Sequence, residues 1–191
     1  HTLLQSAMKG LLQDLDPQRS SAEWLGRRPA LFPRIGAADA GAKTRDLKDD
    51  GVQWLVVDTP AGLHGEDLRE AVKRADLMLV PLTPSAFDMA ATRRFLAAIH
   101  DFKAVKKGTL ALGIVAMRVD ARTLSAAELE AFLAGFDFPV VGHLRDTQVY
   151  VHCARDGASV FDLPRSRGEQ DWAQWKPMTR WIARHAALRD S

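Results

Sequence analysis

The chain has 191 residues, of which 47% are hydrophobic and 26% charged, so it can bury a core and lacks the composition of a disordered protein. Its formal net charge is +2, and its mildly basic pI of about 8.9 permits contact with nucleic acid without requiring it. The single cysteine, Cys153, excludes an internal disulfide, and no apolar run reaches the roughly 18 residues of a membrane-spanning helix. We therefore expect a cytoplasmic protein whose residues 1–191 form one domain.

Strand and helix signals alternate in the first third of the chain. His1–Lys9 has the character of a helix, and the apolar run that ends at Asp16-Pro17 predicts a strand. Ser20, with Glu23 three residues later, predicts a helix that has Ser20 as its N-cap. The expected strands are 11–15, 30–35 and 52–57, and the expected helices are 20–25 and 37–48.

The alternation continues to the C-terminus, where Ser125 is expected to cap a helix. The further strands are expected at 77–82, 109–116 and 139–141, and the helices at 66–74, 86–102, 125–134, 147–155 and 168–188. The strands are continuous apolar runs separated by helices, which is typical of parallel strands covered on both faces. The pattern predicts an α/β fold, a doubly wound and mostly parallel sheet with helices on both faces.

Acidic residues follow two of the predicted strands directly. Asp14 and Asp16 end the first strand, Asp58 ends the strand at 52–57, and a Thr83-Pro84-Ser85 turn follows the strand at 77–82. Ligands of such sheets bind beyond the carboxyl ends of the strands, and neighbouring carboxylates there suit a hydrated Mg²⁺ ion. The alternative is that these aspartates only stabilise turns and helix caps.

Several short segments share their order and spacing with the motifs of a known family. They are 14–18 (DLDPQ) with Ser20, Ser21 and Trp24, then 54–60 (WLVVDTP), 80–85 (VPLTPS), 118–120 (RVD), 144–147 (LRDT) and 157–161 (GASVF). Together they resemble the partitioning group of ParA/MinD-type ATPases, which carry a deviant Walker A motif, over residues 11 to about 188. The resemblance implies a P-loop NTPase-like fold and ATP hydrolysis.

The resemblance also implies a role for each matching residue. Asp16 would orient the attacking water and Asp58 would hold Mg²⁺ through water, so these two are the implied catalytic residues. Asp14 would lie near the metal and the dimer interface, and Arg118 near the adenine. The implied metal ligands are Asp58 and Asp14, and the implied nucleotide-binding residues are Asp14, Asp16, Thr59, Pro60, Met117, Arg118, Arg145 and Thr147.

The sequence departs from the family at the phosphate-binding loop. It contains no GxxxxGK[ST] segment and no strand ahead of one, and Met8-Lys9-Gly10 is no substitute because one glycine cannot form the anion-binding nest. Met117 also stands where the family commonly has an asparagine that binds the adenine. Two explanations remain open: the 191 residues leave out part of the polypeptide, or the protein is a degenerate relative that has lost nucleotide binding.

The predicted last helix has an apolar and a basic face. Trp172, Trp175, Met178, Trp181 and Ile182 recur at helical spacing, which predicts a face that packs on the core. Lys176, Arg180 and Arg184 recur every four residues. They form either a solvated face or a surface that contacts DNA phosphates without sequence specificity, as ParA dimers do.

The function that the resemblance implies is an ATP-dependent switch for DNA partitioning or positioning. ATP and Mg²⁺ would bridge a homodimer that binds DNA nonspecifically on the nucleoid, without any membrane, and a ParB-like partner would stimulate slow hydrolysis. The first alternative is a degenerate, non-hydrolysing interaction module. A metabolic relative is a third: DLDPQ disfavours an amidoligase, and the single cysteine disfavours an iron–sulfur reductase of the nitrogenase type.

Overall fold

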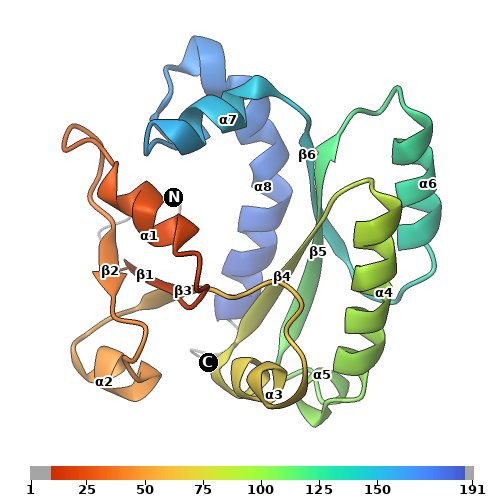
Figure 1. Cartoon of the computed structure of the whole chain (residues 1–191), viewed down its shortest axis with the longest axis horizontal. Coiled ribbons are helices and arrows are strands. Elements are labelled where there is room, and N and C mark those ends of the chain that lie inside the picture. The colour runs from red at the N-terminus through yellow and green to blue at the C-terminus, as the bar shows by residue number, and fades with distance from the viewer. Residues whose placement is uncertain (1–9, 188–191) are drawn as a thin grey trace. The chain divides into compact units, whose positions relative to one another are not determined.

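The computed structural model describes residues 10–187, which divide into two compact units (Figure 1). Unit 1 contains residues 10–61 and 148–169, and unit 2 contains residues 62–147 and 170–187. Each unit has its own three-stranded parallel sheet, so they are described separately. The helix expected at His1–Lys9, and the end of the helix expected at 168–188, lie outside the described residues. The single domain expected over 1–191 remains a prediction.

The sheet of unit 1 has the strand order β2-β1-β3, with all neighbours parallel. Its strands are β1 (Gly10–Asp14), β2 (Gly36–Ala38) and β3 (Trp54–Asp58). The register pairs Asp14 with Asp58, which brings the carboxyl ends of β1 and β3 together. The other elements of this unit are α1 (Ser20–Gly26), α2 (Thr44–Asp49), α7 (Gln148–Arg155) and the 3₁₀ turn η1 (Val160–Asp162).

The sheet of unit 2 has the strand order β4-β5-β6, again parallel throughout. Its strands are β4 (Leu77–Leu82), β5 (Ala111–Val119) and β6 (Val140–Arg145). Its helices are α3 (Gly65–Arg74), α4 (Ala86–His100), α5 (Lys103–Lys106) and α6 (Leu124–Leu133). The long helix α8 (Arg165–Ala187) begins in unit 1 and continues through unit 2. No helix within residues 10–187 is long and apolar enough to cross a membrane.

Helices cover both faces of the unit 2 sheet (Figure 1). On one face, Leu112 and Ile114 of β5 pack with Leu96 of α4 and Leu129 of α6 in the hydrophobic core. On the other face, α8 lies so close that a side chain at Gly113 would meet Trp181 at 3.3 Å. The predicted α/β class, with parallel strands and helices on both faces, is confirmed.

The segment between β1 and α2 differs from its prediction. Residues 30–35 form no strand, because Pro33 interrupts the run and Pro29 directly precedes it, and β2 begins only at Gly36. The buried side chain of Gln13 explains why the predicted helix at 37–48 starts late. Its amide donates to the carbonyls of Asp39 (2.7 Å) and Ala42 (3.0 Å), which holds residues 39–42 in a turn ahead of α2.

Two predicted helix caps are also wrong. Thr123, not Ser125, caps α6, because its hydroxyl accepts a hydrogen bond from the backbone N–H of Ala126 at 3.2 Å. Ser20 lies inside α1, whose N-cap is Arg19 with φ of 57° and no capping side chain. Helix α1 is instead capped from β1, by the carboxylate of Asp14.

Leu129→Ala should lower the free energy of unfolding by about 2–5 kcal/mol, because Leu129 is fully buried in the unit 2 core. Leu124→Ala is the matched control on the same helix, since Leu124 is 76% exposed, and should change stability by less than about 0.5 kcal/mol. Urea denaturation followed by circular dichroism measures both. Equal losses in the two variants would contradict the placement of α6.

Candidate functional site

Three aspartates predicted from the sequence meet at the carboxyl end of the unit 1 sheet. Asp14 and Asp58 are paired in register, and the backbone N–H of Leu15 donates to the carbonyl of Asp58 at 2.8 Å, which extends the pairing by one residue. Asp16 lies in the turn that follows, and the half-buried Thr59 follows Asp58. This edge is the place where ligands bind in open parallel sheets.

Asp14 is 5% exposed, and both of its carboxylate oxygens accept backbone hydrogen bonds. Oδ1 accepts from the N–H of Asp16 at 3.0 Å, and Oδ2 accepts from the N–H of Ala22 at 2.8 Å. A charged acceptor that binds free N–H groups of a helix's first turn stabilises that helix end. Asp14 therefore fixes both the turn that carries Asp16 and the start of α1.

Asp58 and Asp16 each keep one oxygen that accepts no hydrogen bond from the described residues. Asp58 Oδ2 accepts from the hydroxyl of Ser21 at 2.5 Å, and Asp16 Oδ1 accepts from the N–H of Gln18 at 2.8 Å. The opposite oxygen of each carboxylate is left for a ligand or water. Ser21 was part of the sequence motif, but its bond to Asp58 was not foreseen, because the two residues lie 37 positions apart.

The donor set fits Mg²⁺ rather than a metal that needs a complete protein cage. Residues 10–187 contain no group of three or more histidine, cysteine, aspartate or glutamate side chains that could hold a metal ion. Mg²⁺ is typically bound through one or two carboxylates, with water and substrate phosphates as the remaining ligands. The free oxygen of Asp58 suits this role better than Asp14, whose two oxygens already hold backbone amides.

The remaining predicted nucleotide-binding residues lie at the carboxyl ends of β5 and β6 in unit 2. Met117 and Arg118 are among the last three residues of β5. They lie where the register with β6 is irregular, between Ala116 and Val119. Arg118 has φ of 55°, a strained conformation for a residue other than glycine, and such strain is concentrated at functional sites. Its exposed guanidinium lies 3.4 Å from a carboxylate oxygen of Asp146.

Arg145 has a structural partner that the sequence did not reveal. Its guanidinium forms two hydrogen bonds, of 2.8 and 3.1 Å, with the carboxylate of Asp171, which is completely buried. The backbone N–H of Arg145 donates to the side chain of Gln174 at 2.9 Å. These bonds attach the end of β6 to α8, just before Thr147, so Arg145 anchors this edge of unit 2.

The basic residues predicted on the last helix are all exposed. Lys176, Arg180 and Arg184 have no ion-pair partner in the described part of the chain. Met178 and Ile182 are buried at 4% and 6% exposure, as expected for the core face of the same helix. The basic face of α8 is therefore available for contact in the described structure.

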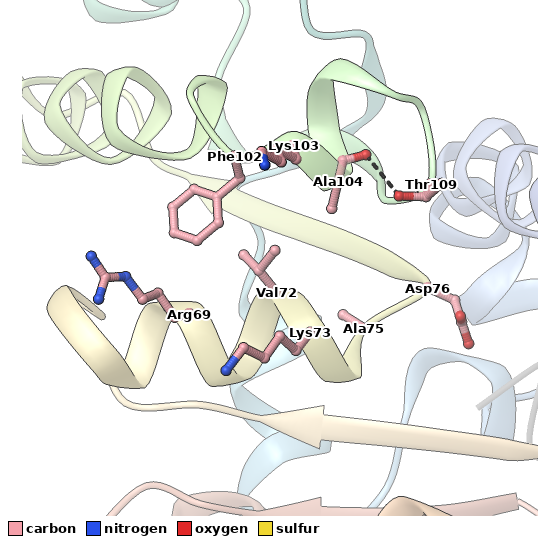
Figure 2. Close-up of a pocket in the computed structure, with 9 residues that line it drawn as sticks. All are labelled: Arg69, Val72, Lys73, Ala75, Asp76, Phe102, Lys103, Ala104 and Thr109. Atoms are coloured by element: carbon pink, nitrogen blue, oxygen red, sulfur yellow. Dashed lines mark hydrogen bonds between the residues drawn. The ribbon is translucent and has the colours of Figure 1, made fainter.

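A separate cavity opens at the amino-terminal end of the unit 2 sheet (Figure 2). It lies near the amino ends of β4 and β5, since Asp76 precedes β4 and Thr109 precedes β5. Its two cations on α3 are already paired one turn back, Arg69 with Glu66 (3.2 Å) and Lys73 with Glu70 (2.6 Å). The cavity is therefore not the candidate site, which lies at the carboxyl ends of the strands.

Comparisons with known proteins give relatives in sequence and in structure, although no family model matches the chain. The chain is 27% identical over 178 residues to the maintenance of carboxysome distribution protein A of Gloeobacter kilaueensis, covering 91% of this chain and 80% of that protein. The MinD cell division protein of Aquifex aeolicus superposes with a TM-score of 0.68 at 16% identity, over 95% of this chain and 87% of that one. A plasmid partition protein of Borrelia burgdorferi bound to AMPPNP superposes with a TM-score of 0.64 at 14% identity, over 94% and 89% of the two chains.

The chain has the ParA/MinD-type fold. The resemblance read from the sequence motifs is thereby confirmed at the level of the fold. Within this fold, the DLDPQ segment forms the end of β1 and the turn into α1, and WLVVD is β3. The roles assigned to individual residues of the site are not tested by these comparisons and remain predictions.

An ion pair in the turn after β5 leads to a prediction about the pKa of Asp120. Hydrogen bonds from the side chain and the backbone N–H of Arg122 lower the pKa of Asp120 from 3.8 to about 2. A lowered pKa in the folded state stabilises the protein above the unfolded-state pKa, and this contribution is lost as the pH falls toward 2. Arg122→Met should therefore return the pKa of Asp120 toward 3.8.

NMR titration of the side-chain carboxyl carbon of Asp120 measures this pKa. Arg118→Met is the control, because Arg118 pairs with Asp146 and should leave the titration of Asp120 unchanged. An unchanged pKa in Arg122→Met would show that the ion pair of Arg122 with Asp120 does not form in solution.

Proposed function

We propose that this protein is an ATP-dependent partitioning or positioning switch of the ParA type, with residues 1–191 forming one ParA-like ATPase domain. The observation that carries the proposal is the meeting of Asp14, Asp16 and Asp58 at the carboxyl end of paired parallel strands, on a ParA/MinD-type fold. The names of the relatives support the general role, since they describe proteins of cell division, plasmid partition and carboxysome distribution.

The proposed chemistry is the transfer of the terminal phosphoryl group of ATP to water. Mg²⁺ bound together with ATP supplies charge neutralisation at the phosphates. Asp58 would hold this ion through water with its free oxygen, and Asp14 would lie next to it and keep the turn in place. Asp16 would use its free oxygen to orient the attacking water, which is the main task of a protein side chain in such reactions.

The remaining contacts to the nucleotide are those that the resemblance implies. Thr59 and Pro60 would lie near the phosphates because they directly follow Asp58. Met117, Arg118, Arg145 and Thr147 would contribute from the ends of β5 and β6. Met117 offers an apolar surface to a base but no amide to recognise its edge, so selectivity for adenine would depend on other groups.

We further propose that Mg²⁺ and ATP join two copies of the chain into a dimer that binds DNA nonspecifically. The exposed cations Lys176, Arg180 and Arg184 on α8, which have no ion-pair partner among residues 10–187, support this, because phosphate contacts require only positioned positive charge. A ParB-like partner would stimulate hydrolysis and release the dimer from DNA. The protein would accordingly lie in the cytoplasm on the nucleoid and would not bind a membrane.

One observation favours a second candidate function. The 191 residues contain no GxxxxGK[ST] loop, and Met117 replaces the expected asparagine. A protein that kept the sheet and the binding surfaces but lost the phosphate site would be a non-hydrolysing interaction module. Such a module would show no Mg²⁺-dependent affinity for ATP, and its oligomeric state would not depend on nucleotide.

Asp16→Ala in the full-length protein should abolish turnover and preserve ATP-dependent dimerisation. The expected loss in kcat is about 10²- to 10⁴-fold, the usual contribution of a group that handles the proton of the nucleophile. Phosphate release measures turnover, and light scattering after size exclusion, with and without Mg-ATP, measures dimerisation. Asp49→Ala, on the exposed face of α2, is the matched control and should keep normal turnover.

Normal hydrolysis by Asp16→Ala would refute the role of Asp16 alone. The absence of Mg²⁺-dependent ATP binding in the unmodified protein would instead refute the ATPase and favour the interaction module.

Replacing Lys176, Arg180 and Arg184 together with glutamine should weaken DNA binding and reduce its dependence on salt. If all three contact phosphates, the slope of log K against log salt should become shallower by about 2.7. Fluorescence anisotropy with a DNA duplex, in the presence of Mg-ATP and at several salt concentrations, measures this slope. The control replaces Lys43, Arg45 and Lys48 near α2 with glutamine, which removes the same net charge. An equal change in the salt dependence would mean that DNA binding depends only on net charge.

A further inference from the structure

A buried ion pair of unit 1 lies away from the aspartate cluster. Arg28 follows α1, and its side chain is 4% exposed, while that of its partner Asp162 in η1 is 1% exposed. The two guanidinium nitrogens Nη1 and Nη2 bind the two carboxylate oxygens at 2.9 and 3.0 Å, in a bidentate arrangement. Removing two charges from water is costly, so such a pair requires further hydrogen bonds around it.

Further hydrogen bonds and two aromatic rings surround the guanidinium of Arg28. Its Nε donates to the carbonyl of Pro33 at 2.9 Å, and Nη1 also donates to the carbonyl of Gly157 at 3.3 Å. The rings of Trp24 and Phe32 lie 5.6 and 5.4 Å from the guanidinium carbon, within the range of cation–π attraction. Only arginine offers a planar fork with enough donors for this set of acceptors.

The same region attaches α1 to the segment 157–162 by two further contacts. The indole N–H of Trp24 donates to the carbonyl of Ala158 at 3.0 Å. The backbone of Gly157, with φ of 65°, approaches Arg27 so closely that a Cβ at position 157 would lie 2.5 Å from the Arg27 carbonyl oxygen. We call Arg28, Asp162, Trp24 and Gly157 the Arg28 clamp.

Helix α1 is therefore held at both ends. At its start, Ala22 donates to Asp14 and Ser21 donates to Asp58, and at its end the Arg28 clamp holds it to the segment 157–162. A helix of seven residues is not stable by itself, so these attachments decide where it lies. Because it spans only about 10 Å, a shift at the clamp displaces the first turn as well.

We infer that Arg28 is a positioning residue of the proposed ATPase reaction. Through α1, the Arg28 clamp sets where the hydroxyl of Ser21 and the N–H of Ala22 meet the carboxylates of Asp58 and Asp14, which the β1–β3 register already places side by side. Arg28 does not touch the reacting groups; it acts through the two hydrogen bonds that join α1 to Asp14 and Asp58. The catalytic part of this inference rests on the proposed function, whereas the mechanical part concerns the folded chain alone.

The test uses two substitutions in the full-length protein. Arg28→Lys keeps the charge but loses the bidentate fork, and Trp24→Phe keeps the ring but loses the hydrogen bond to Ala158. The second variant is milder and keeps the test decisive if Arg28→Lys does not fold. Arg27→Lys is the matched control, since Arg27 is adjacent but its side chain is 50% exposed.

Three readouts separate the mechanical part from the catalytic part: amide hydrogen exchange, kcat and the Kd for ATP. Amide hydrogen exchange at Asp16 and Ala22, the donors to Asp14, should become about 3- to 10-fold faster in both variants, as expected for loss of a hydrogen bond's stabilisation. The kcat for ATP should fall about 10- to 100-fold, because a misplacement of about 1 Å has such effects on rate. The Kd for ATP should change less than kcat, because most of the proposed nucleotide-binding residues lie outside α1 and the Asp16 turn.

The inference is overturned if exchange becomes faster only at Ser159 and Phe161, near the clamp, while Asp16 and Ala22 keep the exchange rates of the unmodified protein. It is equally overturned if kcat is unchanged when exchange at Asp16 and Ala22 rises. If the unmodified protein does not hydrolyse ATP, both the proposed function and the catalytic part of the inference are wrong. The amide exchange rates then still test the mechanical part.

Discussion

The parallel pairing of β1 with β3 is the constraint on which the candidate site depends. It places Asp14 beside Asp58 at one sheet edge, and the chain that leaves β1 must then turn back over this edge as α1. Asp14 makes that turn possible, because its buried carboxylate accepts the N–H groups of both the turn and the helix. The same aspartate that looks like a ligand in the sequence is thus also the residue that shapes the site.

The elements with a strong local signal were predicted well from the sequence. The strand at 77–82 is found with the same bounds, and β3 lies within two residues of its prediction, because long apolar runs closed by proline or aspartate have few alternatives. The region from 27 to 43 was predicted badly. Its course depends on the side chain of Gln13, which binds carbonyls 26 and 29 residues later, and no local pattern encodes such a contact.

The candidate site shows the same division. The aspartates at the strand ends were found from their position after apolar runs, and the structure brings Asp14, Asp16 and Asp58 together. The hydrogen-bond partners that lie far apart in the sequence were missed: Ser21 with Asp58, Arg145 with Asp171, and Arg28 with Asp162, which are 37, 26 and 134 residues apart. Charged residues are common, so a single sequence cannot tell which pair will be buried together.

Gly157 also limits how this region can change over evolution. A side chain there would overlap the backbone of Arg27 and Arg28, and backbone cannot move aside as a flexible side chain can. The constraint at this position therefore comes from the space between two chain segments, not from the chemistry of a side chain. A variant that loses this glycine must rebuild the connection between α1 and the segment 157–162, so the position constrains the sequence even though glycine contributes no side chain.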